Sequence, residues 1–303
     1  MYDIIIIGAG AAGLSCGIYA GRGAMRTLVI EGISAGGQMN STYEIDNYPG
    51  MSDNPDGVTL SQRMKEHAEK FNIEFSTETV KEILGANDRI KTVKTRKNIY
   101  HTKTIIFATG AKPKKGEIPG EEKFQGMGVS YCATCDGAFF KGQETVVIGG
   151  GNTAFEDALY LSNFAKSVTI IHRRDTFRAA KTLVDKAMNN KKINIVTDSV
   201  VTEIKGDTTV SSVVVLNKKT NKTSEIKTSG VFVAIGVVPT SELAGKYVEL
   251  DEKGFIITDK NLETNIKGIY AAGDVRNTPL RQIVTAAADG AIAATSATNY
   301  ING

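Results

Sequence analysis

Two cysteines separated by two residues are the part of this sequence best suited to chemistry. Cys132 and Cys135 lie in the segment Tyr-Cys-Ala-Thr-Cys-Asp-Gly. Cysteines at this spacing can close a small disulfide ring and reopen it with little backbone movement. Near a helix N-terminus such a thiol has a lowered pKa, which favours the reactive thiolate. The pattern predicts a redox-active pair that exchanges with another disulfide.

Asp136 follows the pair directly and is the predicted proton donor and acceptor, because dithiol exchange takes up and releases protons. None of the three histidines, His67, His101 and His172, is adjacent to the pair in sequence, which favours the carboxylate for this role. Two alternatives are half of a zinc site and a pair of core cysteines. A four-cysteine zinc site needs a second pair, and the sequence has none. For Cys16, on the first predicted helix, we expect a structural role.

A strand, a glycine turn and a helix occur in this order twice, and the first copy predicts a dinucleotide site. The strand at residues 3–7 is followed by Gly8, Gly10 and Gly13. Gly8 permits the tight turn, Gly10 leaves room for a pyrophosphate, and Gly13 lets the helix pack closely on the strand. Glu31 ends the next strand, 18 residues beyond Gly13, where a carboxylate can bind ribose hydroxyls.

The second copy of the pattern begins with the strand at residues 145–148. Its glycine turn contains Gly149 and Gly151, and Asn152 and Thr153 follow at the expected start of the helix. A helix that begins at such a turn presents free backbone N–H groups to an anion. We therefore expect these four residues to bind a second dinucleotide.

Cations replace the acid in this second copy. The next strand, residues 167–171, is followed by His172, Arg173 and Arg174, and Arg178 comes four residues later. An acid would repel a 2′-phosphate, whereas an arginine can bind it with two hydrogen bonds. The alternative is a solvated basic helix start, but the cations stand where the discriminating acid would be. The sequence therefore predicts NADPH, in preference to NADH.

These motifs require elements that place the glycine turns at the carboxyl ends of parallel strands. The fold class that we predict is α/β, with two doubly wound Rossmann-like dinucleotide-binding domains. Pro, Gly and charged residues indicate crossings between them at 112–120 and 236–241. The predicted elements are strands 3–7, 27–30, 145–148, 167–171 and 268–272, and helices 14–23, 154–165 and 282–299.

Composition narrows the class of protein further. The 303 residues carry 36 basic and 33 acidic side chains, a net charge of +3, which is too balanced to indicate nucleic-acid binding. No apolar run approaches the ~20 residues of a membrane span, and no signal-peptide pattern is present. Three cysteines cannot form a secreted disulfide framework, which favours a reducing compartment. We expect a cytoplasmic protein that binds neither nucleic acid nor membrane, and no metal site.

The order of these motifs resembles that of the low-molecular-weight thioredoxin reductases over essentially the whole chain. Each short motif is weak evidence alone, but several in one order are specific. The redox pair lies just before the second fingerprint, as in this family, and not near the N-terminus, as in glutathione-reductase-like proteins. The other matching motifs are Gly36-Gly37-Gln38, Asn47-Tyr48-Pro49-Gly50, Ala108-Thr109-Gly110-Ala111, Gly273-Asp274-Val275 and Arg281-Gln282-Ile283.

The resemblance implies roles that spacing alone does not give. It implies that FAD is bound by residues 1–113 and 243–303, and that the NADPH domain, residues 114–242, is inserted between them. Asp274 would bind the ribitol chain of FAD, Cys135 would face the flavin, and Cys132 would attack the protein substrate. The remaining residues expected to contact FAD are Gly37, Gln38, Asn47, Ala108, Thr109, Gly110, Gly273, Arg281, Gln282 and Ile283.

The activity implied is transfer of electrons from NADPH, through FAD and the cysteine pair, to oxidised thioredoxin by a homodimer. Rotation of the inserted domain about hinges at 112–120 and 236–243 would bring nicotinamide and cysteines to the flavin in turn. Val237-Val238 and Phe155 differ from the residues common in the family, and Phe155 can alter packing on the nicotinamide side. Alternatives are reduction of a peroxidase subunit, a glutaredoxin-like protein or a small dithiol, an oxygen-using dithiol oxidase, and a redox sensor without turnover.

Overall fold

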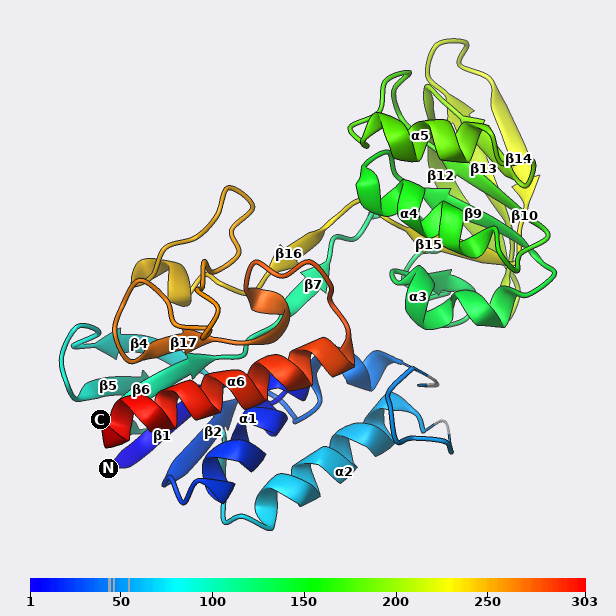
Figure 1. The fold of residues 1–303 in the computed structure, drawn as a ribbon. Helices are drawn as coiled ribbons and strands as arrows, with labels where there is room; N and C mark the ends of the chain where they lie inside the picture. The colour runs from blue at the N-terminus through cyan, green and yellow to red at the C-terminus, as the bar shows by residue number, and fades with distance from the viewer. Residues whose placement is uncertain (43–44, 46, 54) are drawn as a thin grey trace. The chain divides into compact units, whose positions relative to one another are not determined.

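The chain forms two compact units in the computed structural model, which describes residues 1–42, 45, 47–53 and 55–303. Unit 1 comprises residues Met1–Lys112 and Val238–Gly303, and unit 2 comprises Pro113–Val237. The chain passes between the units in β7 (Ala111–Pro113) and β16 (Val237–Pro239), which pair as a two-stranded sheet. Figure 1 shows both units as layered α/β structures.

Unit 1 is built on a seven-stranded sheet. Strands β3, β2, β1 and β6 lie side by side in this order and run parallel, and β17 pairs in parallel with the carboxyl-terminal half of β6. An antiparallel extension, β5 and β4, pairs with the amino-terminal half of β6. The strand bounds are β1 (Tyr2–Ile7), β2 (Thr27–Glu31), β3 (Glu74–Thr77), β4 (Val80–Leu84), β5 (Lys91–Thr95), β6 (Ile99–Phe107) and β17 (Ile269–Ala271).

Three α-helices pack on unit 1: α1 (Ala11–Arg22), α2 (Gly57–Glu69) and α6 (Ile283–Asn302). The backbones of α1 and α6 approach closely at Gly290. A Cβ at this position would lie 2.2 Å from the Ala12 carbonyl oxygen, so only glycine fits there. The Asp56 carboxylate caps α2 by accepting a hydrogen bond from the Thr59 N–H. The 3₁₀ turns are η1 (Gly37–Ser41), η3 (Ala244–Lys246) and η4 (Gly273–Val275).

Unit 2 repeats the parallel arrangement. Strands β11, β10, β9 and β15 follow the same order as β3, β2, β1 and β6, and β8 adds a short edge. An antiparallel sheet of β12, β13 and β14 completes the unit. The strand bounds are β8 (Val129–Ser130), β9 (Glu144–Ile148), β10 (Ser167–Ile171), β11 (Ile193–Val196), β12 (Ser199–Gly206), β13 (Val210–Asn217), β14 (Thr223–Lys227) and β15 (Gly230–Val233). Its helical elements are α3 (Ala133–Asp136), η2 (Gly137–Phe140), α4 (Asn152–Leu161) and α5 (Lys181–Met188).

The predicted α/β fold with two Rossmann-like units is therefore confirmed, and the helix ends are where prediction was least accurate. Helix α1 begins at Ala11 instead of residue 14, since it starts directly after the glycine turn. Helix α4 ends at Leu161 instead of residue 165, because the Phe164 carbonyl accepts from the Gly142 N–H outside the helix. Among the described residues, no helix is long and apolar enough to cross a membrane.

Candidate active site

The first glycine turn lies at the carboxyl end of β1 and is packed too tightly for side chains at two positions. A Cβ at Gly8, whose φ is +107°, would lie 2.3 Å from the Ala108 carbonyl oxygen. A Cβ at Gly13 would lie 1.9 Å from the Gly8 carbonyl oxygen. Gly10, in contrast, faces open space at the start of α1. The turn therefore leaves open space at Gly10 next to the N-terminus of α1, whose free N–H groups suit a pyrophosphate.

Glu31 stands at the end of β2 and is bonded to this turn. Its carboxylate accepts from the Ala9 N–H at 2.9 Å and from the Gly32 N–H at 2.6 Å. The carboxylate is thus held beside the turn, at the residue before Gly10. This position fits the predicted ribose contact, and the same bonds also stabilise the turn.

Of three other predicted segments, one lies against the first turn and the other two are bonded to each other. Gly37, with φ +56°, lies against the first turn, since its Cβ would be 3.4 Å from the Gly10 Cα. The Asn47 side-chain amide donates to the Gln282 side-chain oxygen at 3.1 Å, which brings the loop after η1 to the start of α6. Gln282 and Thr285 cap α6 reciprocally, directly before Ile283 at its first position.

Residues 108–110 follow β6 at the same edge of the sheet as the first turn. The Thr109 hydroxyl donates to the Thr240 carbonyl oxygen at 2.5 Å, and the Gly110 carbonyl accepts from the Thr240 N–H at 2.9 Å. Gly110 has φ +71° and open space where a Cβ would stand. The motif therefore fastens residue 240, beyond the return crossing, to unit 1.

Asp274 and Arg281 are half-buried polar residues that follow β17. Burial raises the pKa of Asp274 to about 6, although the Arg281 charge acts to lower it. Burial likewise lowers the pKa of Arg281. The Arg281 guanidinium lies 4.1 Å from the centre of the Phe255 ring, and its buried Nε has no hydrogen-bond partner within the described part of the chain. A buried unpaired donor of this kind fits a cofactor that supplies the acceptor.

The ion pair of Arg276 with Asp289 was missed by sequence reasoning. The Asp289 carboxylate accepts from Arg276 Nε at 2.7 Å and Nη2 at 2.9 Å, and also from the Gly273 N–H at 3.0 Å. Asp289 lies on α6, so the pair fastens the turn that carries Asp274 to that helix. The sequence feature that could have indicated this pair is Asp289 itself, an acidic residue within the Ala-rich helix.

The second glycine turn follows β9 and is packed in the same way as the first. A Cβ at Gly149 would lie 2.4 Å from the Ala234 carbonyl oxygen, whereas Gly151 faces open space. Gly150 is covered by the His172 ring, whose Nδ1 would be 2.2 Å from an added Cβ. Asn152 and Thr153 begin α4 directly after the turn. This turn thus also leaves open space at a helix start.

The basic segment after β10 is bonded to this second turn. The Arg178 N–H donates to the Gly150 carbonyl at 2.9 Å, and the Ala180 N–H donates to the Asn152 side chain at 2.8 Å. Arg173, Arg174 and Arg178 are exposed, and across residues 1–42, 45, 47–53 and 55–303 none of them has an acidic partner within ion-pair distance. Their charge is therefore available to an anion bound at the turn.

His172 differs from the arginines beside it. It is half-buried under the turn, its Nε2 lies 3.1 Å from the Thr176 carbonyl oxygen, and its ring packs on Phe177. Burial is the main cause that lowers the pKa of His172. Phe155 departs from the family pattern and is fully buried. Its ring packs edge-on against the ring of Phe177. His172 thus supports the turn from within the unit.

Cys132 and Cys135 form a disulfide, with Cα atoms 5.3 Å apart. Cys132 directly precedes α3, and Asp136 ends that short helix. The Asp136 carboxylate accepts from the Ser130 hydroxyl at 2.6 Å, and burial raises its pKa. Asp136 follows Cys135 directly in the chain. A carboxyl group with a raised pKa at this position can both donate and accept a proton during exchange.

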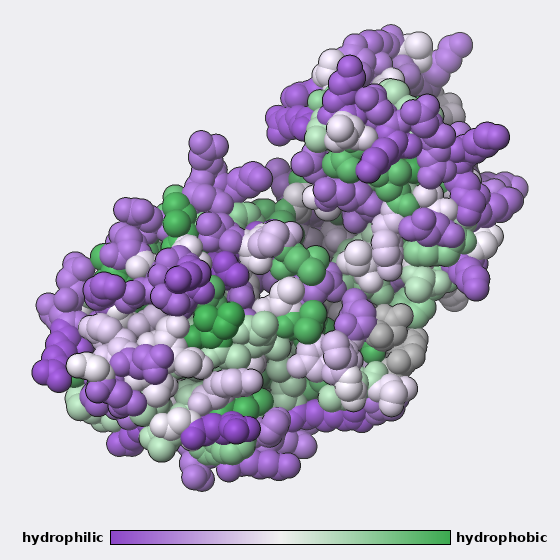
Figure 2. Space-filling view, in the orientation of Figure 1, coloured by the Kyte–Doolittle hydropathy of each residue, from purple (hydrophilic) through white to green (hydrophobic). Residues whose placement is uncertain are grey.

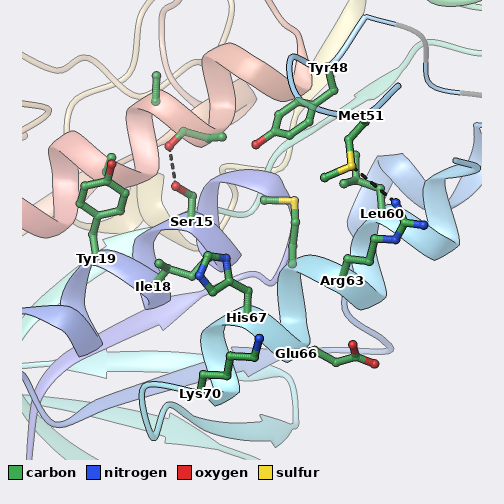
Figure 3. Close-up of a pocket in the computed structure, with 14 residues that line it drawn as sticks. Ser15, Ile18, Tyr19, Tyr48, Met51, Leu60, Arg63, Glu66, His67 and Lys70 are labelled. Atoms are coloured by element: carbon green, nitrogen blue, oxygen red, sulfur yellow. Dashed lines mark hydrogen bonds between the residues drawn. The ribbon is translucent and has the colours of Figure 1, made fainter. Parts of the chain in front are cut away.

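A groove of about 650 Å³ lies between α1, α2 and α6 in unit 1, and no sequence motif indicated it. Figure 3 shows Ile18 and Tyr19 extending from α1, and Arg63, Glu66 and His67 extending from α2. The residues that line it include Tyr19, Leu60, Arg63, Met64, His67 and Ala288.

The fold and the two glycine turns define the class of this protein. Residues 2–290 match the family model described as pyridine nucleotide-disulphide oxidoreductase, and the chain belongs to that family. It is an oxidoreductase whose cofactors are FAD and NADPH. The predicted family resemblance is confirmed by the comparisons that follow.

The similar proteins cover nearly the whole chain. A thioredoxin reductase of Peptoclostridium litorale is 47% identical over 99% of this chain and 97% of its own length. A thioredoxin reductase of Bacillus subtilis (strain 168) is 44% identical over 99% of this chain and 95% of its own length. The crystal structure of thioredoxin reductase from Streptococcus pyogenes MGAS5005 has a TM-score of 0.94 and 45% identity, covering 100% of this chain and 98% of that one.

Proposed function

We propose that this protein is an NADPH-dependent thioredoxin reductase. The observation that carries the proposal is the Cys132–Cys135 disulfide in the unit that also has the second glycine turn and the exposed arginines. Relatives named thioredoxin reductase that are 47% and 44% identical over 99% of the chain support it. Thioredoxin is the proposed substrate, and the cytoplasm, a reducing compartment, is the proposed location.

We assign the two cofactors to the two glycine turns. The domains would be residues 1–113 with 243–303 for FAD, and residues 114–242 for NADPH. The open space at Gly10 and the unpaired Arg281 Nε support the first assignment. The proposed FAD contacts are Gly8, Gly10, Gly13, Glu31, Gly37, Gln38, Asn47, Ala108, Thr109, Gly110, Gly273, Asp274, Arg281, Gln282 and Ile283. The proposed NADPH contacts are Gly149, Gly151, Asn152, Thr153, His172, Arg173, Arg174 and Arg178.

The redox pair performs the exchange in this scheme. FAD, when bound, supplies an electron pair drawn from NADPH. The Cys132–Cys135 disulfide takes up two electrons and two protons and opens to a dithiol. The Cys132 thiolate then attacks the disulfide of oxidised thioredoxin to form a mixed disulfide, and the departing partner thiolate is protonated. Cys135 attacks Cys132 Sγ, which re-forms the pair and releases reduced thioredoxin.

Asp136 handles protons in these steps. Because burial favours its protonated form, it can donate to a departing thiolate and later take a proton from a thiol. Ser130 holds the carboxyl group in place. Asp136 is therefore the proposed acid and base of the exchange.

We also propose a homodimer formed through the groove of unit 1. Exposed apolar side chains lie on α1 and α6: Tyr19, which lines the groove, is 50% exposed, and Ile292 on α6 is 43% exposed. Hydrophobic patches interrupt the hydrophilic surface on the face that carries α6 (Figure 2). Sedimentation should show a dimer that Ala288→Glu, in the groove, converts to monomer, while Thr223→Glu, on exposed β14 of unit 2, leaves it intact. A dimeric Ala288→Glu variant would refute this surface.

An anaerobic titration of the purified holoenzyme tests the activity. NADPH should bleach the flavin at much lower concentration than NADH, and oxidised thioredoxin should restore the colour. If NADPH does not bleach the flavin, the arginine assignment is wrong. If bleaching occurs but thioredoxin has no effect, the partner is a different disulfide, such as that of a peroxidase subunit or a glutaredoxin-like protein.

A further inference from the structure

A buried carboxylate holds the segment by which the chain enters unit 2. Glu121 is 3% exposed, and it accepts from the Gly116 N–H at 2.9 Å and from the Ile118 N–H at 3.0 Å. Glu117, between these two donors, has φ +56°, so the carboxylate stabilises a turn that the backbone does not favour. We call residues 113–121 the incoming segment.

The incoming segment is also bonded to the antiparallel sheet of the same unit. The Pro119 carbonyl accepts from the Ile204 N–H of β12 at 2.8 Å. A Cβ at Gly120, where φ is +90°, would lie 2.1 Å from the Ile204 carbonyl oxygen. Residues 116–121 are therefore held inside unit 2.

The third bond of the Glu121 carboxylate leads to the redox pair. The Tyr131 hydroxyl donates to it at 2.7 Å, and Tyr131 directly precedes Cys132. On the other side of Tyr131, the Ser130 hydroxyl accepts from the Cys132 N–H at 3.1 Å. Two preceding residues thus hold Cys132 in place. Ser130 accepts from its N–H and donates to Asp136, and Tyr131, joined to it by the peptide bond, donates to Glu121.

We propose that the Tyr131–Glu121 hydrogen bond positions Cys132 for disulfide exchange by fastening it to the incoming segment. The proposal rests on the exchange chemistry proposed for the cysteine pair. Neither residue touches the reacting sulfurs, so both act as positioning residues. The bond is charge-assisted and half-buried, which makes it stronger than a bond between neutral groups.

Tyr131→Phe is the sharpest test, because it removes only the hydroxyl. We expect kcat/KM for oxidised thioredoxin to fall about tenfold, because the variant lacks one charge-assisted hydrogen bond that holds Cys132 in the transition state. Alkylation of Cys132 by iodoacetamide in the NADPH-reduced holoenzyme should change in rate as well. The rate of flavin bleaching by NADPH should stay within about twofold of the parent, since that step precedes the exchange.

Glu121→Gln separates the two functions of the carboxylate. A glutamine can keep the Tyr131 and Gly116 bonds with its oxygen, but its NH₂ then faces the Ile118 N–H, a donor against a donor. We expect lower thermal stability and a smaller loss of exchange than Tyr131→Phe gives. The matched control is Tyr160→Phe, on α4 of the same unit, whose ring packs on Phe164.

Two results would overturn the proposal. One is that the Tyr131→Phe and Tyr160→Phe variants show the same kcat/KM for oxidised thioredoxin per folded molecule. The other is an equal loss in flavin bleaching and in exchange, which would indicate general damage to the unit. Failure of the parent enzyme to reduce thioredoxin would refute the proposed activity instead. Cys132 alkylation and reduction of 5,5′-dithiobis(2-nitrobenzoate) would then still test the positioning.

Discussion

The buried ion pair of Arg276 and Asp289 leads to a quantitative prediction for Asp289→Asn. Its two side chains are only 16% and 10% exposed, and the carboxylate accepts three hydrogen bonds at 2.7 to 3.0 Å. An asparagine presents NH₂ to at least one of these donors, and Arg276 keeps a buried charge without a partner. Breaking a buried pair from one side costs about 3–5 kcal/mol.

Release of FAD during urea unfolding measures this loss in unit 1, since flavin fluorescence rises when the cofactor leaves. With a denaturant dependence of about 2–3 kcal/mol per molar urea, we expect the release midpoint to fall by roughly 1–2 M. FAD should also bind more weakly at zero urea, because Asp289 holds the turn that carries Asp274 through the Gly273 N–H.

Asp53→Asn is the matched control for this experiment. Asp53 binds Arg63 through two bonds, at 3.2 and 2.7 Å, but the two side chains are 55% and 44% exposed. Water and salt screen such a pair, so the midpoint should not move measurably. If Asp289→Asn and Asp53→Asn release FAD at the same urea concentration, burial is not what gives the Arg276 pair its strength, and the reasoning is wrong.

Three further predictions concern the cysteine pair, the NADPH site and a buried acid. Cys135→Ser should abolish turnover but leave flavin bleaching by NADPH intact; turnover above one-hundredth of the parent would contradict the exchange scheme. Arg174→Ala combined with Arg178→Ala should raise KM for NADPH by about a hundredfold and leave KM for NADH nearly unchanged, because each charge-assisted bond contributes about tenfold. Burial raises the pKa of Asp157 to about 7, so its ionisation destabilises the fold as pH rises through that value. Asp157→Asn should therefore leave urea stability unchanged near pH 4 and raise it by about 3–4 kcal/mol at pH 8; an equal effect at both would refute the shift.

Strands and glycine turns were predictable because their signals are local. A short β-branched run followed by glycines specifies a buried strand and a tight turn wherever it occurs, and β1, β9 and β10 lie within one residue of their predicted bounds. The end of α4 was not predictable from its own residues. The turn after it is held by the Lys192 side chain, which donates to the Ser162 and Ala165 carbonyls from nearly 30 residues away.

In the candidate site, too, the features with local sequence signals were predictable and the long-range contacts were not. By itself the sequence predicted the two dinucleotide sites, the preference for NADPH and the redox pair, because each depends on residue types at short, fixed spacing. The family and FAD followed from the order of the motifs along the chain. Only the tertiary structure decided that Asp289 secures Gly273, that Glu121 fastens Tyr131, and that α1, α2 and α6 leave a groove. These features join residues about 10 to 270 positions apart. Such pairs carry no periodic or local signal, since only packing of the chain brings them within bonding distance.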